Sequence, residues 1–358
     1  MLRRQKNVRF VMAEATAIHA DQRRVEAGGH MYSYDTLVIA VGVQYNYFGH
    51  EEWREVAPSL KTIADAEEIL RRVLTAFERA ESEPDPALRR ADLTYLLVGG
   101  GPTGVEMAGA LAELLKETLG RELTQVKSQE VRILLVEAAE RILTQFPEDL
   151  ANASAARLKQ LGVEIITGKH VTEIDAEGVM IGEEPIATKT VIWTAGVKGV
   201  PLLATLGVPL DKAGRIPVNA QLEVEGLPGV YVVGDAASIT GPDGKPLPGV
   251  AQVAMQGGDY VGAAIRASIA GRELGKPFHY WDKGNLAVVG RSFAIADLHR
   301  YRFRGFFAWI LWLFIHILYL STFRARFFVF LRWTSAFLFK DRSAIVFDTP
   351  VVPAKVQS

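Results

Sequence analysis

A glycine-rich turn near residue 100 limits the folds open to this chain more than any other feature. The stretch LLVGGGPTGVEMAGALAELL, residues 96–115, holds Gly99, Gly101 and Gly104 in the spacing Gly-x-Gly-x-x-Gly. In such a turn the first glycine permits a tight bend, the second lets the backbone approach a pyrophosphate, and the third lets a helix pack closely on a strand. The pattern predicts a site where backbone amides and a helix dipole hold the phosphates of a dinucleotide.

The residues around the turn support this interpretation. We expect a strand at Leu93–Val98, a helix from about Thr103 to Leu119 and a second strand at Val131–Val136, which together form a βαβ unit. Glu137 ends the second strand, where a carboxylate accepts hydrogen bonds from the adenosine ribose and repels a 2′-phosphate. The sequence therefore predicts that NADH is preferred over NADPH.

The turn begins almost a hundred residues into the chain, which raises the question of what precedes it. Val38–Val43 (VIAVGV) and Ile192–Val197 (IWTAGV) both read as an apolar strand that runs into a glycine, one before the βαβ unit and one after it. Two related nucleotide domains would each end a strand in this way, although any buried strand that ends in glycine looks similar. We predict that a nucleotide domain is inserted into a second domain.

Other segments supply elements for both domains. Branched and aromatic residues predict strands at Val8–Ile18 and Met31–Val41, and apolar residues at helical spacing predict a helix at Asp65–Arg79. The segment VYVVGDAA predicts a strand that ends at Gly234 and Asp235. Asp235 either accepts hydrogen bonds from a ligand's hydroxyl groups or caps a helix.

Composition excludes several classes of site. The 358 residues carry a formal net charge of −1, which gives no overall field for binding nucleic acid. Cysteine is absent, so disulfide scaffolds, thiolate metal sites and a catalytic dithiol are excluded, and we predict no metal site. The first residues, MLRRQKNVRF, lack the features of a signal peptide, so we expect the chain on the cytoplasmic side.

The C-terminal part contains two apolar runs with basic flanks. Residues 305–320 (GFFAWILWLFIHILYL) are almost wholly apolar but fall short of the ~20 residues that a spanning helix needs. With residues 326–339 they predict a pair of helices on the surface of an anionic membrane, so residues 305–342 form the expected membrane contact. The alternative is a buried core or dimer helix. The flanking cations are Arg302, Arg304, Arg324, Arg326, Arg332, Lys340 and Arg342.

Five motifs in a fixed order identify a family resemblance. They are LLVGGGPTGVEMAGALAEL, VIWTAGVKG, VYVVGDAA, AQVAMQGG and DKGNLAVVGR. Together they resemble the type II NADH:quinone oxidoreductases, over nearly the whole chain. The resemblance implies an α/β fold with two dinucleotide-binding domains, the cofactors FAD and NAD, and transfer of two electrons from NADH through FAD to a membrane quinone of the respiratory chain without proton pumping. It also implies a peripheral protein on the cytoplasmic face of the inner membrane, and it leaves a homodimer open.

The resemblance also divides the chain. It implies an FAD domain at residues 1–60 and 197–275, an NAD domain at 61–196 and a membrane-associating region at 276–358. The family opens with its own strand, Gly-x-Gly-x-x-Gly turn and helix for the FAD diphosphate, and the given sequence does not begin with this pattern. Either the sequence is an incomplete reading of a longer gene, which we favour, or the product lacks the main anchor of the flavin and exposes a sheet edge.

The resemblance assigns residues to each ligand. Glu106 matches a glutamate near the nicotinamide and flavin, although it could be a first-turn acid that only the helix dipole stabilises. Gln252 and Gln256 match residues that line the quinone pocket, although either could bridge neighbouring backbone. Lys283 matches a lysine that helps to supply protons, although it could be an exposed turn lysine. The matching cofactor residues are Ala15, Ala40, Gly42, Gly234 and Asp235 for FAD and Gly99, Gly101, Gly104, Glu137 and Gly196 for the dinucleotide sites.

Two other functions stay open on the sequence. One is a soluble flavin reductase that passes electrons to a small iron–sulfur protein, which the apolar C-terminus disfavours. The other is a membrane-attached NADH-binding remnant that has lost its flavin and has no catalytic activity.

Overall fold

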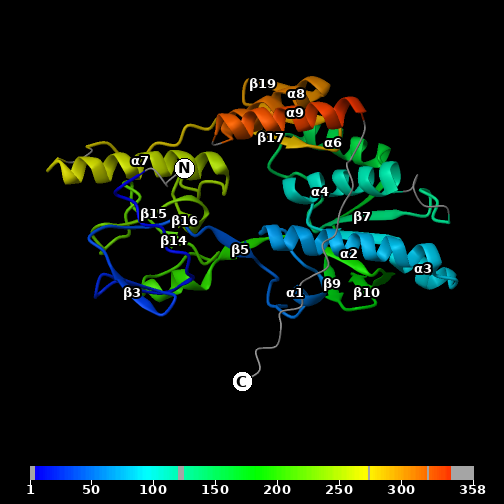
Figure 1. Ribbon diagram of the computed structural model, residues 1–358, viewed down its shortest axis with the longest axis horizontal. Coiled ribbons are helices and arrows are strands. Elements are labelled where there is room, and N and C mark those ends of the chain that lie inside the picture. The colour runs from blue at the N-terminus through cyan, green and yellow to red at the C-terminus, as the bar shows by residue number, and fades with distance from the viewer. Residues whose placement is uncertain (1–4, 120–124, 273–274, 321, 340–358) are drawn as a thin grey trace. The chain divides into compact units, whose positions relative to one another are not determined.

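The computed structural model shows α-helices and β-sheets arranged in two compact units (Figure 1). One unit consists of Met1–Asn46 and Val197–Lys283, and the other of Tyr47–Gly196 and Gly284–Ser358. The chain therefore leaves the first unit, builds the second and returns, as the predicted insertion requires. The predicted domain limits at residues 60, 196 and 275 stay a prediction about cofactor domains. The structure describes residues 5–119, 125–272, 275–320 and 322–339.

The first unit contains several small sheets and one long helix. Its elements are β1 (Ala15–His19), β2 (Arg24–Ala27), β3 (His30–Ser33), β4 (Leu37–Ile39), β5 (Val43–Tyr45), β13 (Val197–Gly199), the 3₁₀ helix η3 (Pro201–Leu206), β14 (Ile216–Pro217), β15 (Val230–Val232), the 3₁₀ turn η4 (Gly234–Ala236), β16 (Ala237–Ser238) and α7 (Ala251–Ile269). Strands β1, β2 and β3 form an antiparallel sheet, whereas β4 and β15 pair in parallel. The core of this unit includes Ile39, Val232 and Val253.

Two strand predictions for this unit are wrong. The predicted strand Val8–Ile18 begins only at Ala15, and residues 8–14 are not in a strand. Phe10 and Met12 are 76% and 92% exposed, so their apolar character reflects no sheet face. The predicted strand Met31–Val41 is two strands, because β3 pairs with β2 whereas β4 pairs with β15. Apolar periodicity does not reveal which partner a strand has.

The second unit is built on a parallel sheet with the order β12-β6-β7-β8. The elements before and within that sheet are α1 (Trp53–Val56), α2 (Ile63–Ser82), α3 (Pro86–Asp92), β6 (Thr94–Val98), α4 (Pro102–Ala112), the π-helical turn η2 (Glu113–Leu119), β7 (Arg132–Glu137), α6 (Glu148–Gln160), β8 (Val163–Thr167) and β12 (Thr190–Trp193). An antiparallel sheet precedes β12 and comprises β9 (Val171–Ile174), β10 (Gly178–Ile181) and β11 (Glu184–Ala187).

The helices of this unit follow their sequence signals with one exception. The predicted helix at 65–79 forms as α2, whose N-cap Thr62 accepts a hydrogen bond from the Asp65 N–H while the Asp65 carboxylate accepts one from the Thr62 N–H. The helix predicted from Thr103 to Leu119 is α-helical only to Ala112 and then widens into η2. The widening begins at Glu113, a buried residue whose carboxylate accepts the Arg291 N–H.

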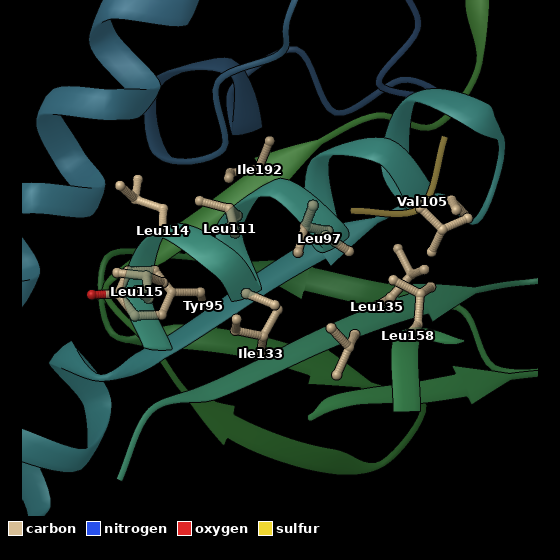
Figure 2. Packing of buried hydrophobic residues seen from close by; sticks show 14 of the residues in the cluster. Tyr95, Leu97, Val105, Leu111, Leu114, Leu115, Ile133, Leu135, Leu158 and Ile192 are labelled. Atoms are coloured by element: carbon tan, nitrogen blue, oxygen red, sulfur yellow. The ribbon is translucent and has the colours of Figure 1, made fainter. Parts of the chain in front are cut away.

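The sheet and its helices enclose the main apolar core (Figure 2). Leu97 and Leu135 lie on adjacent parallel strands and are completely buried, as is Val105 on α4. Figure 2 shows these side chains gathered between α4 and the strands. Because interiors are close-packed, this core fixes the position of α4 over the sheet.

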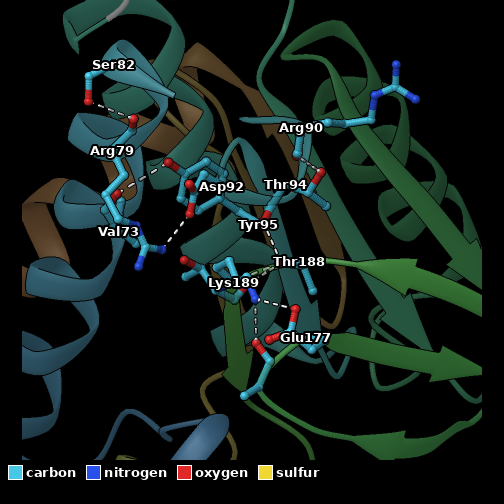
Figure 3. A network of polar contacts seen from close by, with 12 residues as sticks. Val73, Arg79, Ser82, Arg90, Asp92, Thr94, Tyr95, Glu177, Thr188 and Lys189 are labelled. Atoms are coloured by element: carbon cyan, nitrogen blue, oxygen red, sulfur yellow. Dashed lines mark hydrogen bonds and ion pairs between the residues drawn. The ribbon is translucent and has the colours of Figure 1, made fainter. Parts of the chain in front are cut away.

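A polar network surrounds the start of β6 (Figure 3). The buried Asp92 carboxylate accepts a hydrogen bond from Arg79 at 2.5 Å, which joins α2 to the beginning of the strand. Thr188 donates to the Thr94 carbonyl oxygen at 2.5 Å, and Tyr95 donates to the Val73 carbonyl oxygen at 3.3 Å. The buried side chains of Asp92, Thr188 and Tyr95 therefore each have a hydrogen-bond partner, as a stable interior requires.

The C-terminal segment adds a small sheet and two helices to the second unit. Its elements are β17 (Asn285–Val288), β18 (Ala294–Leu298), β19 (Tyr301–Gly305), α8 (Phe306–Tyr319) and α9 (Phe323–Phe339). The strands form an antiparallel sheet, α8 packs on all three of them, and α9 contacts α8 (Figure 1). Within the described residues, no helix has the length and apolarity to cross a membrane. Lys340 and Arg342 lie outside the described residues.

We expect Leu97→Ala to lower the free energy of unfolding by about 2–5 kcal/mol, because it leaves a cavity in the close-packed core of the second unit. Leu88→Ala is the matched control, since Leu88 is 47% exposed on α3, and its cost should stay within about 0.5 kcal/mol. Urea unfolding followed by tryptophan fluorescence measures both. Equal losses in the two variants would contradict this description of the core.

Candidate functional site

A cavity of about 690 Å³ opens at the carboxyl ends of the parallel strands in the second unit. Parallel α/β sheets bind their ligands at this edge, and the volume lies within the range of small-molecule sites. The glycine turn after β6, the end of β7 and the segment after β12 all contribute to its walls. The lining residues include Phe48, His50, Trp53, Gly99, Gly100, Gly101, Glu137, Thr144, Lys169, His170, Thr172, Trp193 and Gly196.

The three predicted glycines have different environments in the turn. Gly99 has a φ of +111°, a conformation that other residues rarely adopt. A Cβ at Gly104 would lie 1.8 Å from the Gly99 carbonyl oxygen, so the close approach of the helix to the strand requires glycine at this position. A Cβ at Gly101 would meet nothing within 4 Å, and Gly101 lines the cavity. The geometry therefore leaves room at Gly101 for a ligand's phosphates, at the N-terminus of α4.

Glu137 is held by the backbone at the end of β7. One carboxylate oxygen accepts the Gly100 N–H at 2.5 Å and the other accepts the Ala139 N–H at 2.8 Å. Both bonds fix the carboxylate beside the glycine turn and against the cavity. A fixed negative charge there disfavours a further phosphate on the ribose, in line with the prediction for NADH.

Two groups of lining residues were missed from the sequence. Trp53 and Trp193 contact each other at 5.6 Å between ring centroids, and His50 stacks on Trp53 at 4.0 Å, which gives the cavity an aromatic wall. Lys169 and His170 follow β8 directly and also line the cavity. Their position just after a strand of the parallel sheet was an available signal, because ligands bind at that edge. No sequence signal pointed to the aromatic wall, since residues 48–53 are far from the glycine turn in sequence.

Four of the residues predicted to bind FAD lie in the first unit, just beyond the ends of the parallel strands β4 and β15. Strand β4 runs into Ala40 and Gly42, and its partner β15 is followed by Gly234 and Asp235. Gly42 and Gly234 have φ angles of +69° and +66°, so each strand ends in a turn that favours glycine. This arrangement fits a bound ligand with hydroxyl groups, because Asp235 provides acceptor oxygens beyond the strand ends. Ala15, by contrast, begins β1 in the separate antiparallel sheet.

Gln252, Gln256 and Lys283 also lie together in the first unit. The Gln256 amide donates to the Trp281 carbonyl oxygen and accepts the Trp281 N–H, both at 2.9 Å. The Gln252 carbonyl oxygen accepts the Lys283 N–H at 3.0 Å. Two successive turns of α7 therefore bind the segment 281–283, and the Lys283 ammonium lies 5.5 Å from the centre of the Trp281 ring. Both glutamines bridge neighbouring backbone, which the sequence had left as an alternative.

Glu106 lies on α4 but does not line the 690 Å³ cavity. One of its carboxylate oxygens accepts the Val288 N–H at 3.1 Å, so it joins α4 to β17. Burial raises the pKa of Glu106 above its ordinary value of 4.5, and the hydrogen bond from Val288 partly opposes this shift. An acid with a raised pKa is suited to exchange protons nearer neutral pH.

The fold, together with the 690 Å³ cavity at the glycine turn (the dinucleotide cavity), is that of a nucleotide-dependent oxidoreductase with two dinucleotide-binding domains. The family model described as Pyridine nucleotide-disulphide oxidoreductase matches residues 1–258, and the model described as NDH2 C-terminal domain matches residues 282–342. Because the first model covers more than half of the chain, the α/β architecture predicted from the motifs is confirmed.

Individual relatives narrow the family. The type II NADH:quinone oxidoreductase Ndh of Mycobacterium tuberculosis is 39% identical, over 96% of this chain and 77% of the relative. The enzyme of the same name from Staphylococcus haemolyticus is 31% identical, over 80% of this chain and 71% of the relative. A solved structure of NDH2 from Plasmodium falciparum in complex with NADH has a similar fold, with a TM-score of 0.85, 18% identity and coverage of 92% of this chain and 84% of that one. The chain belongs to the type II NADH:quinone oxidoreductases, so the resemblance drawn from the motifs is confirmed.

The glycine turn gives a matched pair of variants. We expect Gly101→Ala to keep the thermal midpoint of the chain nearly unchanged, because the methyl group enters open space, and to weaken NADH binding by roughly tenfold or more, because it occupies the phosphate position. Gly104→Ala should instead prevent stable folding of the second unit, since its methyl group overlaps the Gly99 carbonyl oxygen. Calorimetric titration with NADH and thermal melting separate the two effects. A Gly101→Ala variant that binds NADH normally would contradict the assignment.

The raised pKa of Glu106 predicts a pH-dependent contribution to stability. The folded chain holds this proton more tightly than the unfolded chain, so the contribution is complete below pH 4.5 and is lost as the pH rises through the raised pKa. Glu106→Gln should therefore become more stable relative to wild type as the pH rises above 4.5. Thermal midpoints across this range measure the difference, with exposed Glu67→Gln as the control. Parallel curves for wild type and Glu106→Gln would contradict it.

Proposed function

We propose that this chain transfers two electrons from NADH through FAD to a membrane quinone without pumping protons. The observation that carries the proposal is the built cavity at the glycine turn, where Gly101 leaves room for phosphates and Glu137 is fixed beside them. The relatives at 39% and 31% identity are named for the same reaction.

In this proposal the second unit binds and orients NADH. The N-terminus of α4 and the amides of the glycine turn hold the pyrophosphate, and Glu137 selects an adenosine ribose without a phosphate. The cavity is bounded by Gly196, which follows β12, and by the rings of Trp193 and Trp53, which would shield a bound nicotinamide from water. Exclusion of water protects the reduced nicotinamide from side reactions.

The first unit would hold the flavin. Asp235 would accept hydrogen bonds from the ribityl chain, and Gly42 and Gly234 would allow close approach of the backbone at the two strand ends. Ala40 would lie along the same edge, and the backbone at Ala15 would face the adenine. When bound, FAD supplies the capacity to take two electrons from NADH and to pass them to a quinone.

The quinone end of the reaction would be organised by α7. Gln252 and Gln256 hold the segment 281–283 in place through its backbone. Lys283 would then present a cationic ammonium group that supplies protons to a reduced quinone. Glu106 matches a glutamate near the nicotinamide, but it does not line the 690 Å³ cavity, so this proposal gives it no step in the reaction. These roles follow from matching motifs together with the observed hydrogen bonds.

Attachment to a membrane would deliver the quinone. Helices α8 and α9 expose large apolar side chains, among them Phe307 at 81% and Phe323 at 82%, next to the cations Arg324 and Arg332. Apolar aromatics with flanking cations suit the interface of an anionic leaflet. We place the protein at the cytoplasmic face of the inner membrane as a peripheral enzyme, and a homodimer stays open.

The variant Gln256→Ala tests this assignment and the function together. In wild type, NADH should bleach the blue absorbance of bound FAD and quinone should restore it. Gln256→Ala should slow the second step by roughly tenfold or more, because the segment 281–283 loses both bonds to Trp281, while the first step stays normal. Stopped-flow spectra measure the two steps separately.

Asp259→Asn, an exposed position one turn further along α7, is the matched control and should leave both steps unchanged. Equal loss of both steps in Gln256→Ala would overturn the assignment of this residue to the quinone end. A full-length wild-type protein without a flavin spectrum would overturn the proposed function itself.

A further inference from the structure

A second cavity, of about 250 Å³, lies within the second unit and shares no lining residue with the dinucleotide cavity. It is an open hollow lined by α4 and the start of η2, by the end of β17 and the segment that follows it, and by α8 and α9. Its volume is smaller than the 300–1,000 Å³ typical of drug-sized ligands, so it suits a small headgroup rather than a dinucleotide. The residues that matter for its chemistry are Glu106, Arg291, Trp309, Trp312, Leu313 and Trp333.

One end of this cavity carries a carboxylate that has been largely removed from water. Glu106 lines the cavity and uses one oxygen to accept the Val288 N–H. Its other oxygen has no hydrogen-bond partner in the part of the chain that the structure describes. A desolvated carboxylate is stabilised best by a cation that also donates hydrogen bonds, and its raised pKa reflects the same lack of solvation.

The walls of the cavity are aromatic. Trp312 on α8 and Trp333 on α9 stack with ring centroids 5.6 Å apart and an interplanar angle of 15°, and Trp309 lines the cavity one turn before Trp312. The face of an indole attracts a cation, more strongly where water is excluded. The carboxylate and the indoles therefore favour the same kind of ligand group, a small ammonium ion.

Arg291 adds a complementary charge at the same cavity. Its backbone N–H is accepted by the carboxylate of Glu113, which also lines the cavity. A guanidinium has five N–H donors in a planar fork that matches phosphate oxygens, so it can serve a phosphate in addition to protein partners. An ammonium and a phosphate joined by a short linker would therefore meet complementary groups.

We infer that this cavity binds the phosphoethanolamine headgroup of a membrane phospholipid. The ammonium contacts Glu106 and the indoles, and the phosphate contacts Arg291. A primary ammonium fits better than a quaternary one, because only the primary group donates hydrogen bonds to a carboxylate. The exposed phenylalanines of α8 and α9 provide a surface for the acyl chains, so the inference rests on the membrane attachment proposed above but not on the quinone chemistry.

The test compares vesicles of equal surface charge. The full-length holoenzyme is titrated with vesicles of phosphatidylglycerol mixed equally with either phosphatidylethanolamine or phosphatidylcholine, and binding is measured by flotation. Wild type should bind the ethanolamine vesicles roughly fivefold more tightly, because only that headgroup donates hydrogen bonds to Glu106. Glu106→Gln should lose this preference, because it removes the carboxylate that accepts those hydrogen bonds. Arg332→Gln, an exposed neighbour of Trp333 that does not line the cavity, should keep it.

The outcomes separate the inference from its alternatives. Equal binding of wild type to both vesicles overturns it, whether or not the variants fold, and thermal melting identifies any variant that does not. A preference that persists in Glu106→Gln also overturns it, because the preference then reflects lipid packing. Binding of soluble glycerophosphoethanolamine without vesicle binding overturns the lipid source. If wild type turns over quinone normally but binds both kinds of vesicle equally, this inference is wrong and the proposed function is still supported.

Discussion

The close approach of α4 to the end of β6 is the contact on which the rest of the site depends. Only a glycine at position 104 lets the helix begin this near the Gly99 carbonyl oxygen. The Thr194 hydroxyl, just after β12, donates to the Val98 and Gly99 carbonyl oxygens at 2.8 and 3.0 Å, so the end of a second strand is fixed at the same point. Because α4 and two strand ends meet there, the conformation of the glycine turn is determined by packing and not by flexible side chains.

Helix α4 also connects the nucleotide turn to the C-terminal segment within the second unit. Glu106 and Glu113, two turns apart on one face, accept the backbone N–H groups of Val288 and Arg291. Between them, Gly109 packs directly against the backbone near Gly290, where a Cβ would lie 2.6 Å from the nitrogen. A shift of the C-terminal helices would thus reach Glu106 through backbone contacts. This contact would connect the membrane attachment proposed for α8 and α9 to the nucleotide site within one compact unit.

The sequence predicted those features that depend on local chemistry. The glycine turn, Glu137 at the end of its strand and the helix at α2 depend on spacing and capping that are visible in a short window. The strand predicted at Val8–Ile18 failed because a strand also needs a partner, and apolar composition does not supply one. The aromatic wall was missed because only the tertiary fold brings residues 48–53 to the cavity, and Lys169 and His170 were missed because no strand was predicted at residues 163–167. The fold class and the position of the glycine turn could therefore be predicted from the sequence, whereas the side walls of the cavity could not.

The glutamines of α7 show why a motif match alone does not define a role. The Gln256 side-chain amide donates to the Trp281 carbonyl oxygen and accepts the Trp281 N–H, as the backbone of a paired strand residue does. The Gln252 side-chain oxygen accepts the Lys283 N–H. A side chain that is already paired in this way contributes to a quinone site mainly by fixing the segment that faces it. The residues that would touch the quinone are then Trp281 and Lys283, whose ring and ammonium lie 5.5 Å apart. In the proposed function α7 therefore holds the loop 281–283 in position, and the loop would carry the chemistry.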